Sequence, residues 1–295
     1  MILHSAKKSL ILLLITLPPS LAHGDSITGG DTVYVVRKGD TPQLVSARTG
    51  VSWRQISRDN TIAGEKGLQP GQELKINARR IVPAVIESGI IINVPDRTLY
   101  YFEENRLVHS FAVGLGLIGP KSGMVWRTPL GKFKVISKEK NPTWYVPPSI
   151  QEEMAMEGKE VKTVVPPGPE NPLGRYAIKT TIPGIMIHET IKHSSVNQYR
   201  SHGCIRVLPE NMEKFFEEVE PRTSGELIYM PVKAAISGEG RVFLEVHKDY
   251  YGTITDMKEE AKKQLAKTGS IMRVDWQKVE TLLKEKSGIP EDVTL

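Results

Sequence analysis

The apolar run IMI at residues 185–187 leads into His188, and after twelve intervening residues the chain reads SHGCIRV, residues 201–207. Short apolar runs of this kind, separated by Gly and Pro, are typical of buried strands. The pattern therefore predicts two neighbouring strands, one delivering His188 and the other following Cys204. Cys204 is the single cysteine of the 295 residues, so the chain cannot form an internal disulfide.

The residues around Cys204 are those that an activated thiol needs. A cysteine nucleophile requires a base or a positive neighbour, and backbone donors for the oxyanion. Gly203 allows a sharp turn in which consecutive amides can converge on a carbonyl oxygen. His188 can face the sulfur from the neighbouring strand, whereas the orientation of His202 is left open by its spacing. These residues favour catalysis over the alternative, an inert buried cysteine beside a core histidine.

Residues 90–231 read as one unit around these two motifs. We expect strands at residues 90–94, 98–102, 107–113, 131–137 and 227–230, with proline-rich loops at 141–148 and 165–174. Pro209 opens a helix whose apolar face carries Met212, Phe215, Phe216 and Val219. The pattern predicts a mostly β catalytic domain, a sandwich or barrel-like sheet with one helix packed on it, in an α+β protein.

The first residues predict export. Lys7 and Lys8 precede the apolar run 10–17, two prolines break that run, and small residues follow up to Ala22. The run is too short to span a bilayer and is typical of a secretory signal peptide. We expect residues 1–22 to be removed and the mature protein to be periplasmic or associated with the cell wall.

Residues 31–77 predict a small separate unit of the order strand, helix, helix, strand. The stretches VRKGDT at 36–41 and LQPGQ at 68–72 resemble a LysM module. The resemblance implies a βααβ domain that binds N-acetylglucosamine-containing glycan strands such as those of peptidoglycan.

Residues 232–295 differ in texture from the unit before them. A strand at 241–246 and two amphipathic helices near 256–266 and 274–285 predict a mainly helical C-terminal extension. Nothing in these residues indicates chemistry. Structural packing and contact with a protein partner both remain open for this segment.

Composition and spacing exclude several functions. Removing residues 1–22 leaves 37 basic against 34 acidic residues, a net charge of +3. The sequence also lacks a basic stripe with interleaved aromatic residues, so it does not predict binding to nucleic acid. Residues 114–119 spell GLGLIG, but the residues after them do not predict the helix of a dinucleotide site. His188 and His193 are five residues apart, whereas a zinc-protease helix needs a spacing of four. We expect neither a metal nor a cofactor.

His188 and the segment SHGCIR resemble the signature of the L,D-transpeptidase catalytic domain, also called the YkuD domain. The stretches TPLGKF at 128–133, NPTW at 141–144 and PPGPENPLG at 166–174 are similar to that family too. The sequence departs from the family at Glu189, where Gly or Ser is usual, and in residues 190–200, which differ from the usual glycine-rich loop.

The resemblance implies a mechanism on peptidoglycan stem peptides. Cys204 would attack the bond between the L-centre of a diamino acid and a terminal D-alanine and form a thioester. An amine from another stem or from a protein would then resolve the thioester. The resemblance gives His188 as general base and then acid, and amides near Gly203 and Cys204 as oxyanion donors. His202, Ser201 and Arg206 would orient groups or bind carboxylates, and a carbapenem would add to the thiol.

Two alternatives remain. Water could resolve the same thioester, which would make the protein an L,D-carboxypeptidase or an amidase. A glycan-binding scaffold with an inert thiol belongs to another class of function, and thiol alkylation kinetics separate it from an enzyme.

Overall fold

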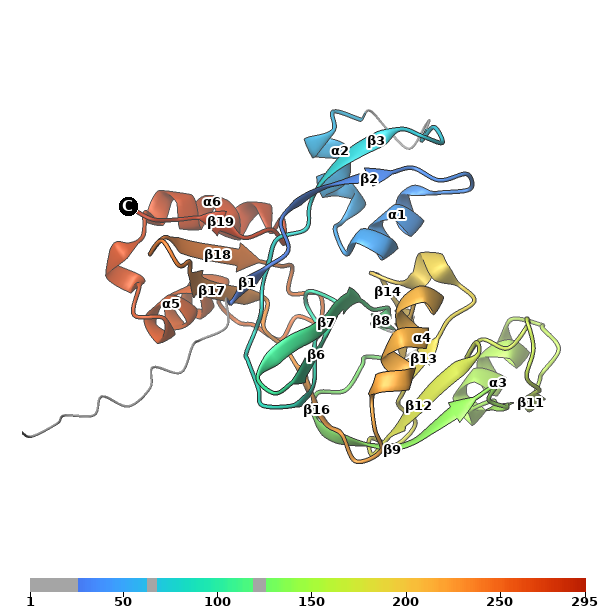
Figure 1. The fold of residues 1–295 in the computed structure, drawn as a ribbon. Coiled ribbons are helices and arrows are strands. Elements are labelled where there is room, and N and C mark those ends of the chain that lie inside the picture. The colour runs from blue at the N-terminus through green and yellow to red at the C-terminus, as the bar shows by residue number, and fades with distance from the viewer. Residues whose placement is uncertain (1–25, 63–67, 119–125) are drawn as a thin grey trace, which may run out of the picture.

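The computed structural model describes residues 26–62, 68–118 and 126–295 (Figure 1). The predicted signal peptide lies outside these residues. No helix within the described ranges is long and apolar enough to cross a membrane. The described chain has an N-terminal part, a central sheet and a C-terminal part, coloured from blue to red in Figure 1.

The N-terminal part has two strands and two helices. Strand β2 (Asp31–Val35) pairs antiparallel with β3 (Glu73–Asn77), and α1 (Pro42–Thr49) and α2 (Trp53–Asp59) lie between them in sequence. Thr41 begins α1, because its side chain accepts a hydrogen bond from a first-turn amide. Beyond this part, β1 (Ile27–Thr28) and β4 (Arg80–Ile81) form a short ladder that leads to the central sheet.

The central part is one mixed sheet of eight strands, in the order β15-β13-β12-β9-β16-β5-β6-β7. The strands are β5 (Gly89–Asn93), β6 (Thr98–Glu103), β7 (Arg106–Ala112), β9 (Gly131–Lys140), β12 (Tyr176–Thr180), β13 (Met186–Glu189), β15 (Ile205–Val207) and β16 (Ser224–Ile228). Just beyond β7, Gly114 exchanges two main-chain hydrogen bonds of 2.8 and 2.9 Å with Arg206 in β15. This bridge joins the two edges, so the sheet closes into a near-barrel.

Helix α4 (Pro209–Glu218) fills the core of this near-barrel. All four residues predicted for its apolar face are buried: Met212, Phe215 and Phe216 within the helix and Val219 at its C-cap. Phe215 packs edge-on against Tyr101 of β6 and Phe111 of β7, with ring centroids 5.5 and 5.7 Å apart. The helix therefore holds the far strands of the sheet against those that carry the motifs.

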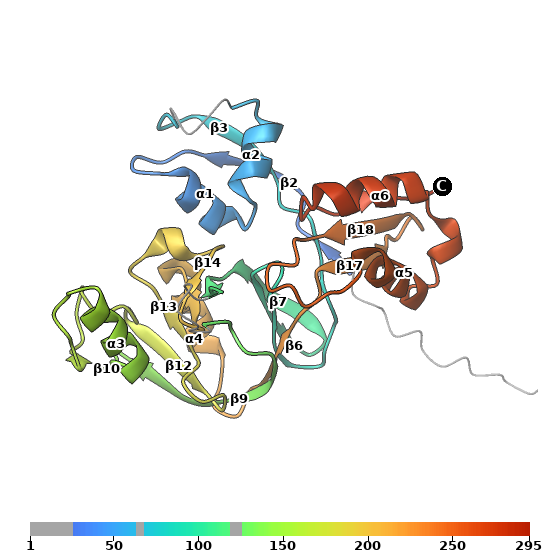
Figure 2. The same cartoon turned by 180° about the vertical axis from the view of Figure 1, so that it is seen from behind.

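A small lobe, which the sequence analysis did not predict, projects at the end of the sheet away from the C-terminal part (Figure 2). It consists of β10 (Trp144–Tyr145), α3 (Pro148–Met156) and β11 (Val164–Val165), and β10 pairs antiparallel with β11. Helix α3 buries none of its residues, so it has no apolar stripe by which the sequence could reveal it.

The segment between β13 and β15 contains one turn and one short strand. It contains a 3-10 turn, η1 (His193–Ser195), and then β14 (Tyr199–Ser201), which pairs parallel with β8 (Leu115–Gly116). Strand β14 leads directly into the loop that carries Cys204. The position of this loop therefore depends on what holds β8 and β14.

The C-terminal part is a sheet with two helices packed on it, which corrects the prediction of a mainly helical extension. Its antiparallel strands are β17 (Val232–Ile236), β18 (Val242–Val246) and β19 (Glu291–Asp292). Helices α5 (Met257–Lys267) and α6 (Trp276–Glu285) lie where the apolar periodicity placed them. The sequence missed β17 because a lysine, Lys233, occupies one of its fully buried positions.

The three parts are packed together. Ala47 of α1 is buried against Ala112, Val196 and Leu208 of the central part. The C-terminal part contributes Ile289 to the apolar core of the N-terminal part. The N-terminal part is therefore fixed on both neighbours, whereas its composition had suggested a separable unit.

Candidate active site

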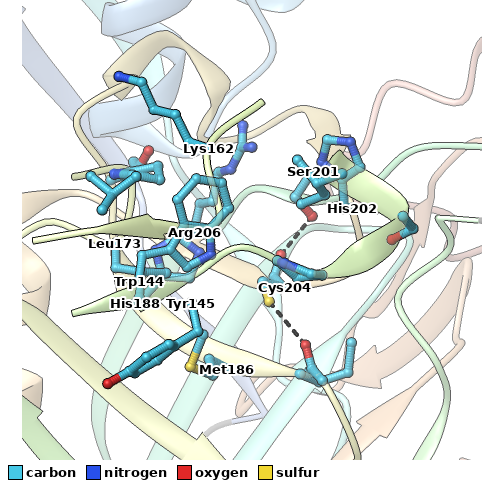
Figure 3. Close-up of a pocket in the computed structure, with 18 of the residues that line it drawn as sticks. Trp144, Tyr145, Lys162, Leu173, Met186, His188, Ser201, His202, Cys204 and Arg206 are labelled. Carbon is cyan, nitrogen blue, oxygen red and sulfur yellow. Dashed lines mark hydrogen bonds between the residues drawn. The ribbon is translucent and has the colours of Figure 1, made fainter. Parts of the chain in front are cut away.

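Parallel pairing of β13 with β15 brings the two sequence motifs together. His188 is in register with Arg206, and Cys204 precedes the first residue of β15. Because side chains alternate along a strand, Cys204 and Arg206 project from the same face, next to His188. All three line one cavity of about 1080 Å³, together with Ser201 and His202. The structure thus collects five of the six predicted site residues around one space (Figure 3).

His188 is held in one tautomer in this site. It is buried, and its Nδ1 donates to the main-chain oxygen of Glu189 at 2.6 Å. The pKa of His188 is lowered to about 4, mainly by burial and also by the charge of Arg206, while the Glu189 hydrogen bond opposes both. Since Nδ1 carries the proton, Nε2 has a free lone pair at neutral pH.

Cys204 is held as a thiol. Its Sγ donates to the main-chain oxygen of Gly184 at 3.4 Å (Figure 3). Burial raises the pKa of the Cys204 thiol, while the main-chain amide of Met186 and the charge of Arg206 oppose the rise. The hydrogen bonds of the described side chains do not join Cys204 to His188. Burial therefore favours the neutral form of both the Cys204 thiol and the His188 imidazole.

Ser201 and Gly203 shape the loop that carries the thiol. Ser201 Oγ donates to the Cys204 carbonyl at 2.6 Å and accepts from the Gly203 amide at 3.1 Å. Gly203 has φ of +110°, a left-handed conformation that favours glycine. Because Ser201 already engages the Gly203 amide, the amide of Cys204 is the better candidate for an oxyanion donor.

His202 faces a partner that the sequence analysis missed. Its Nε2 lies 2.7 Å from Oε2 of Glu153 in α3, and its ring lies 4.0 Å from that of Trp126. His202 thus ties the cysteine loop to the small lobe. Glu153 lies between two proline-rich loops on a helix without an apolar stripe, so no local pattern predicts its role.

Arg206 supplies positive charge to the cavity. Burial lowers the pKa of its guanidinium, and the charge of an ionised Cys204 opposes this shift. None of the ion pairs among the described residues includes Arg206. A guanidinium in this position suits a carboxylate of an incoming ligand.

One group of described side chains has metal-ligand chemistry, and it lies outside this cavity. Asp96, Glu245 and His247 bring one ligand atom each within 4.8 Å of one another. However, Nζ of Lys233 lies 2.7 Å from Oδ2 of Asp96 and 2.7 Å from Oε1 of Glu245. The ammonium group occupies the place that a cation would take, so these residues do not fit a metal.

Comparison with known proteins identifies the family. Residues 87–233 match the model of the L,D-transpeptidase (YkuD) catalytic domain, and residues 34–77 match the LysM domain. The probable L,D-transpeptidase ErfK/SrfK of Escherichia coli strain K12 is 29% identical over 289 residues, which cover 94% of this chain and 90% of that protein. The probable L,D-transpeptidase YbiS of the same strain is 27% identical over 286 residues, with coverages of 92% and 90%.

A solved structure is a more distant match. The catalytic domain from E. faecium L,D-transpeptidase acylated by ertapenem is 19% identical, with a TM-score of 0.36, and the match covers 49% of this chain and 99% of that one. The family models and the near full-length relatives carry the assignment without it. Both predicted resemblances are confirmed: this chain belongs to the L,D-transpeptidase family, with a YkuD catalytic domain preceded by a LysM domain.

Proposed function

We propose that this protein is a peptidoglycan L,D-transpeptidase with Cys204 as its nucleophile. Sγ attacks the carbonyl between the L-centre of a diamino acid and the terminal D-alanine of a tetrapeptide stem. D-alanine leaves, and a thioester to Cys204 remains. An amine from a second stem, or from a protein, then displaces the thiol and forms a 3→3 cross-link or a protein attachment.

The observation that carries this proposal is that Cys204 and His188, delivered by paired strands, line one cavity of a YkuD domain, with His188 Nδ1 engaged by the Glu189 carbonyl. The thiol turns from the Gly184 oxygen towards His188 and gives its proton to Nε2 as the C–S bond forms. His188 then donates this proton to the departing amine of D-alanine. In the second half, Nε2 takes a proton from the attacking amine and returns it to the sulfur.

Main-chain and cationic groups assist this proton transfer. The amide of Cys204 lies next to the reacting sulfur and can donate to the oxyanion of the tetrahedral intermediate. Arg206 can bind a carboxylate of the stem peptide, and its charge also stabilises the departing thiolate. His202 and Ser201 orient the loop, since both are engaged in hydrogen bonds to other protein groups.

The LysM domain indicates where the enzyme works. A glycan-binding domain beside a stem-peptide enzyme supports the proposal that both bind peptidoglycan and that the protein works in the cell envelope, either periplasmic or extracellular. Contact of the C-terminal part with a further protein remains a prediction.

The test uses protein beginning after residue 22 and purified disaccharide-tetrapeptides, with products read by mass. The proposal expects release of D-alanine and a cross-linked dimer whose mass corresponds to loss of one D-alanine. Cys204→Ala should give neither product. Release of D-alanine with only the trimmed tripeptide, even with abundant acceptor amine, would show water as the acceptor and make the protein a carboxypeptidase. No Cys204-dependent product would overturn the proposal.

A further inference from the structure

A tyrosine of the C-terminal part reaches the loop that carries Cys204. Tyr251 follows β18, is buried, and belongs to the apolar core of the catalytic domain. Its hydroxyl donates to the Gly116 carbonyl at 2.6 Å and accepts from the Thr128 amide at 3.0 Å. One hydroxyl from outside the YkuD domain therefore holds two segments of that domain together.

These two segments in turn hold Gly203. The Gly116 amide donates to Thr128 Oγ1 at 2.8 Å, so the Thr128 hydroxyl proton is directed elsewhere. It points to the Gly203 carbonyl, at 3.0 Å. The hydroxyls of Tyr251 and Thr128 thus each accept one hydrogen bond and donate one. Tyr251, Gly116 and Thr128 form a closed set of buried contacts whose outward bond goes to Gly203.

The bond to Gly203 fixes the direction of a second group. The carbonyl of Gly203 and the amide of Cys204 belong to the same planar peptide unit. Holding the oxygen of this unit therefore aims the N–H of Cys204, the candidate oxyanion donor. A buried, fully paired set of hydrogen bonds is well suited to such precise orientation.

The neighbouring residue, Tyr250, packs against the other end of the same loop. Tyr250 stacks on Tyr199 of β14, with ring centroids 3.8 Å apart and ring planes 3° from parallel. The amide of Tyr251 donates to the hydroxyl of Tyr229 at 2.8 Å, which fixes the backbone of the pair. The C-terminal part thus holds the segment 199–204 at both ends.

We propose that Tyr251 is a positioning residue for acyl transfer, acting through Thr128 to aim the peptide unit between Gly203 and Cys204 at the developing oxyanion. This inference rests on the proposed function. It gives the C-terminal part a role in the reaction, since the C-terminal part supplies a hydroxyl that the active-site loop needs.

The test separates two reactions of the same sulfur. Acylation by ertapenem builds negative charge on a carbonyl oxygen and needs the oxyanion donor. Alkylation by iodoacetamide forms a C–S bond without an oxyanion. Tyr251→Phe and Thr128→Val remove one hydroxyl each, Thr128→Ser keeps it, and Tyr100→Phe removes a buried hydroxyl that donates to Asp96 instead. Intact mass gives the limiting acylation rate and the half-saturating ertapenem concentration, and iodoacetamide gives the alkylation rate.

Tyr251→Phe and Thr128→Val should lower the limiting acylation rate roughly 10- to 100-fold. The half-saturating concentration and the alkylation rate should stay within about twofold, Thr128→Ser should stay near wild type, and the double variant should be no slower than Thr128→Val alone. Tyr100→Phe should lose stability and keep its acylation rate.

Three results would overturn the inference: wild-type acylation in Tyr251→Phe, an equal loss of acylation and alkylation, or the same acylation loss in Tyr100→Phe. If Tyr251→Phe does not fold, wild-type acylation of Thr128→Val would overturn it as well. Failure of the wild-type protein to be acylated or to process muropeptides would count against the proposed function itself.

Discussion

His188 donates its Nδ1 proton to the main-chain oxygen of Glu189, 2.6 Å away, so the residue that follows the histidine serves it through its backbone. The Glu189 side chain turns instead towards Arg175, with 3.4 Å between the nearest charged atoms. Gly174 leaves room there, because a Cβ at that position would lie 2.7 Å from Cβ of Glu189. A backbone acceptor is available from any residue, which explains how a glutamate can stand where the family usually has Gly or Ser.

The pH dependence of acylation should report His188 as a neutral base. Its pKa of about 4 keeps Nε2 unprotonated through neutral pH, so the acylation rate with ertapenem should fall only as the pH approaches about 4. An acid limb near the ordinary value of 6.5 would contradict a buried, neutral His188. The same shift affects stability: the unfolded chain binds the proton more tightly, so stability is full above 6.5 and declines as the pH falls towards 4.

Cys204→Ala should abolish acyl transfer and preserve the fold. The thiol makes one weak hydrogen bond, so its loss should change the melting temperature little, and pelleting with insoluble peptidoglycan should persist. Intact mass of the wild type after ertapenem should show one adduct, and Cys204→Ala should show none. Cross-linked or trimmed muropeptides from the alanine variant would disprove the assignment of the nucleophile.

Substitution of His188 and of His202 should affect acylation and thiol alkylation differently. His188→Ala should slow acylation by about 10²–10⁴-fold, as expected for a lost acid–base catalyst. Because the resting imidazole is neutral and burial already raises the pKa of the thiol, this variant should shift the pH midpoint of iodoacetamide alkylation little.

His202→Ala breaks the contact with Glu153 and should act through the geometry of the loop. Glu153→Gln is the matched control, since it keeps a hydrogen-bond acceptor and removes the charge. A large upward shift of the alkylation midpoint in His202→Ala alone would mean that the roles of the two histidines are reversed.

Deleting residues 31–77 should impair more than wall binding. From the sequence, this deletion would weaken pelleting and spare turnover. In the structure, Asn197 donates to the Ser46 hydroxyl at 3.0 Å, and Ala47 covers Val196 and Leu208. The deletion exposes these apolar groups and frees the segment that leads to Cys204, so it should lower both the melting temperature and the acylation rate. A deletion variant with wild-type values of both would show that the domains are independent.

Lys233→Met should destabilise the protein strongly. The substitution leaves Asp96 and Glu245 buried without their cation, and breaking a buried ion pair typically costs about 3–5 kcal/mol. Lys214→Met, at an exposed position of α4, is the control. Burial alone would raise the pKa of the Asp96 and Glu245 carboxyls, but Lys233 lowers it. The contribution of these carboxylates to wild-type stability is therefore present above about pH 4 and is lost as the pH falls further. Urea denaturation of both variants measures the difference.

The sequence predicted those parts whose pattern is local. Strand runs such as 90–94 and the apolar face of α4 appear where periodicity placed them, and so do the helices after residue 255. His188 and the motif around Cys204 likewise gave five of the residues that line the cavity.

The rest depends on contacts between distant segments. Lys233 in a buried strand, Glu153 on a helix without an apolar stripe, and Thr128 beside Gly203 have no local signature. Each acquires its role from a partner at least 49 residues away in the chain. Single-sequence periodicity does not report such pairs.

The burial of Ala47 against the catalytic domain also bears on how the enzyme samples its surroundings. If a flexible linker joined the LysM domain to the catalytic domain, the thiol could reach many stem peptides around one binding point, and their number would grow with linker length. Here the LysM domain packs against the catalytic domain, so binding to one glycan strand would bring the Cys204 thiol close only to the few stem peptides around that point. If the LysM domain binds a glycan strand, the protein must dissociate and rebind to reach another stem, and the release rate of that domain would then limit turnover in the intact wall.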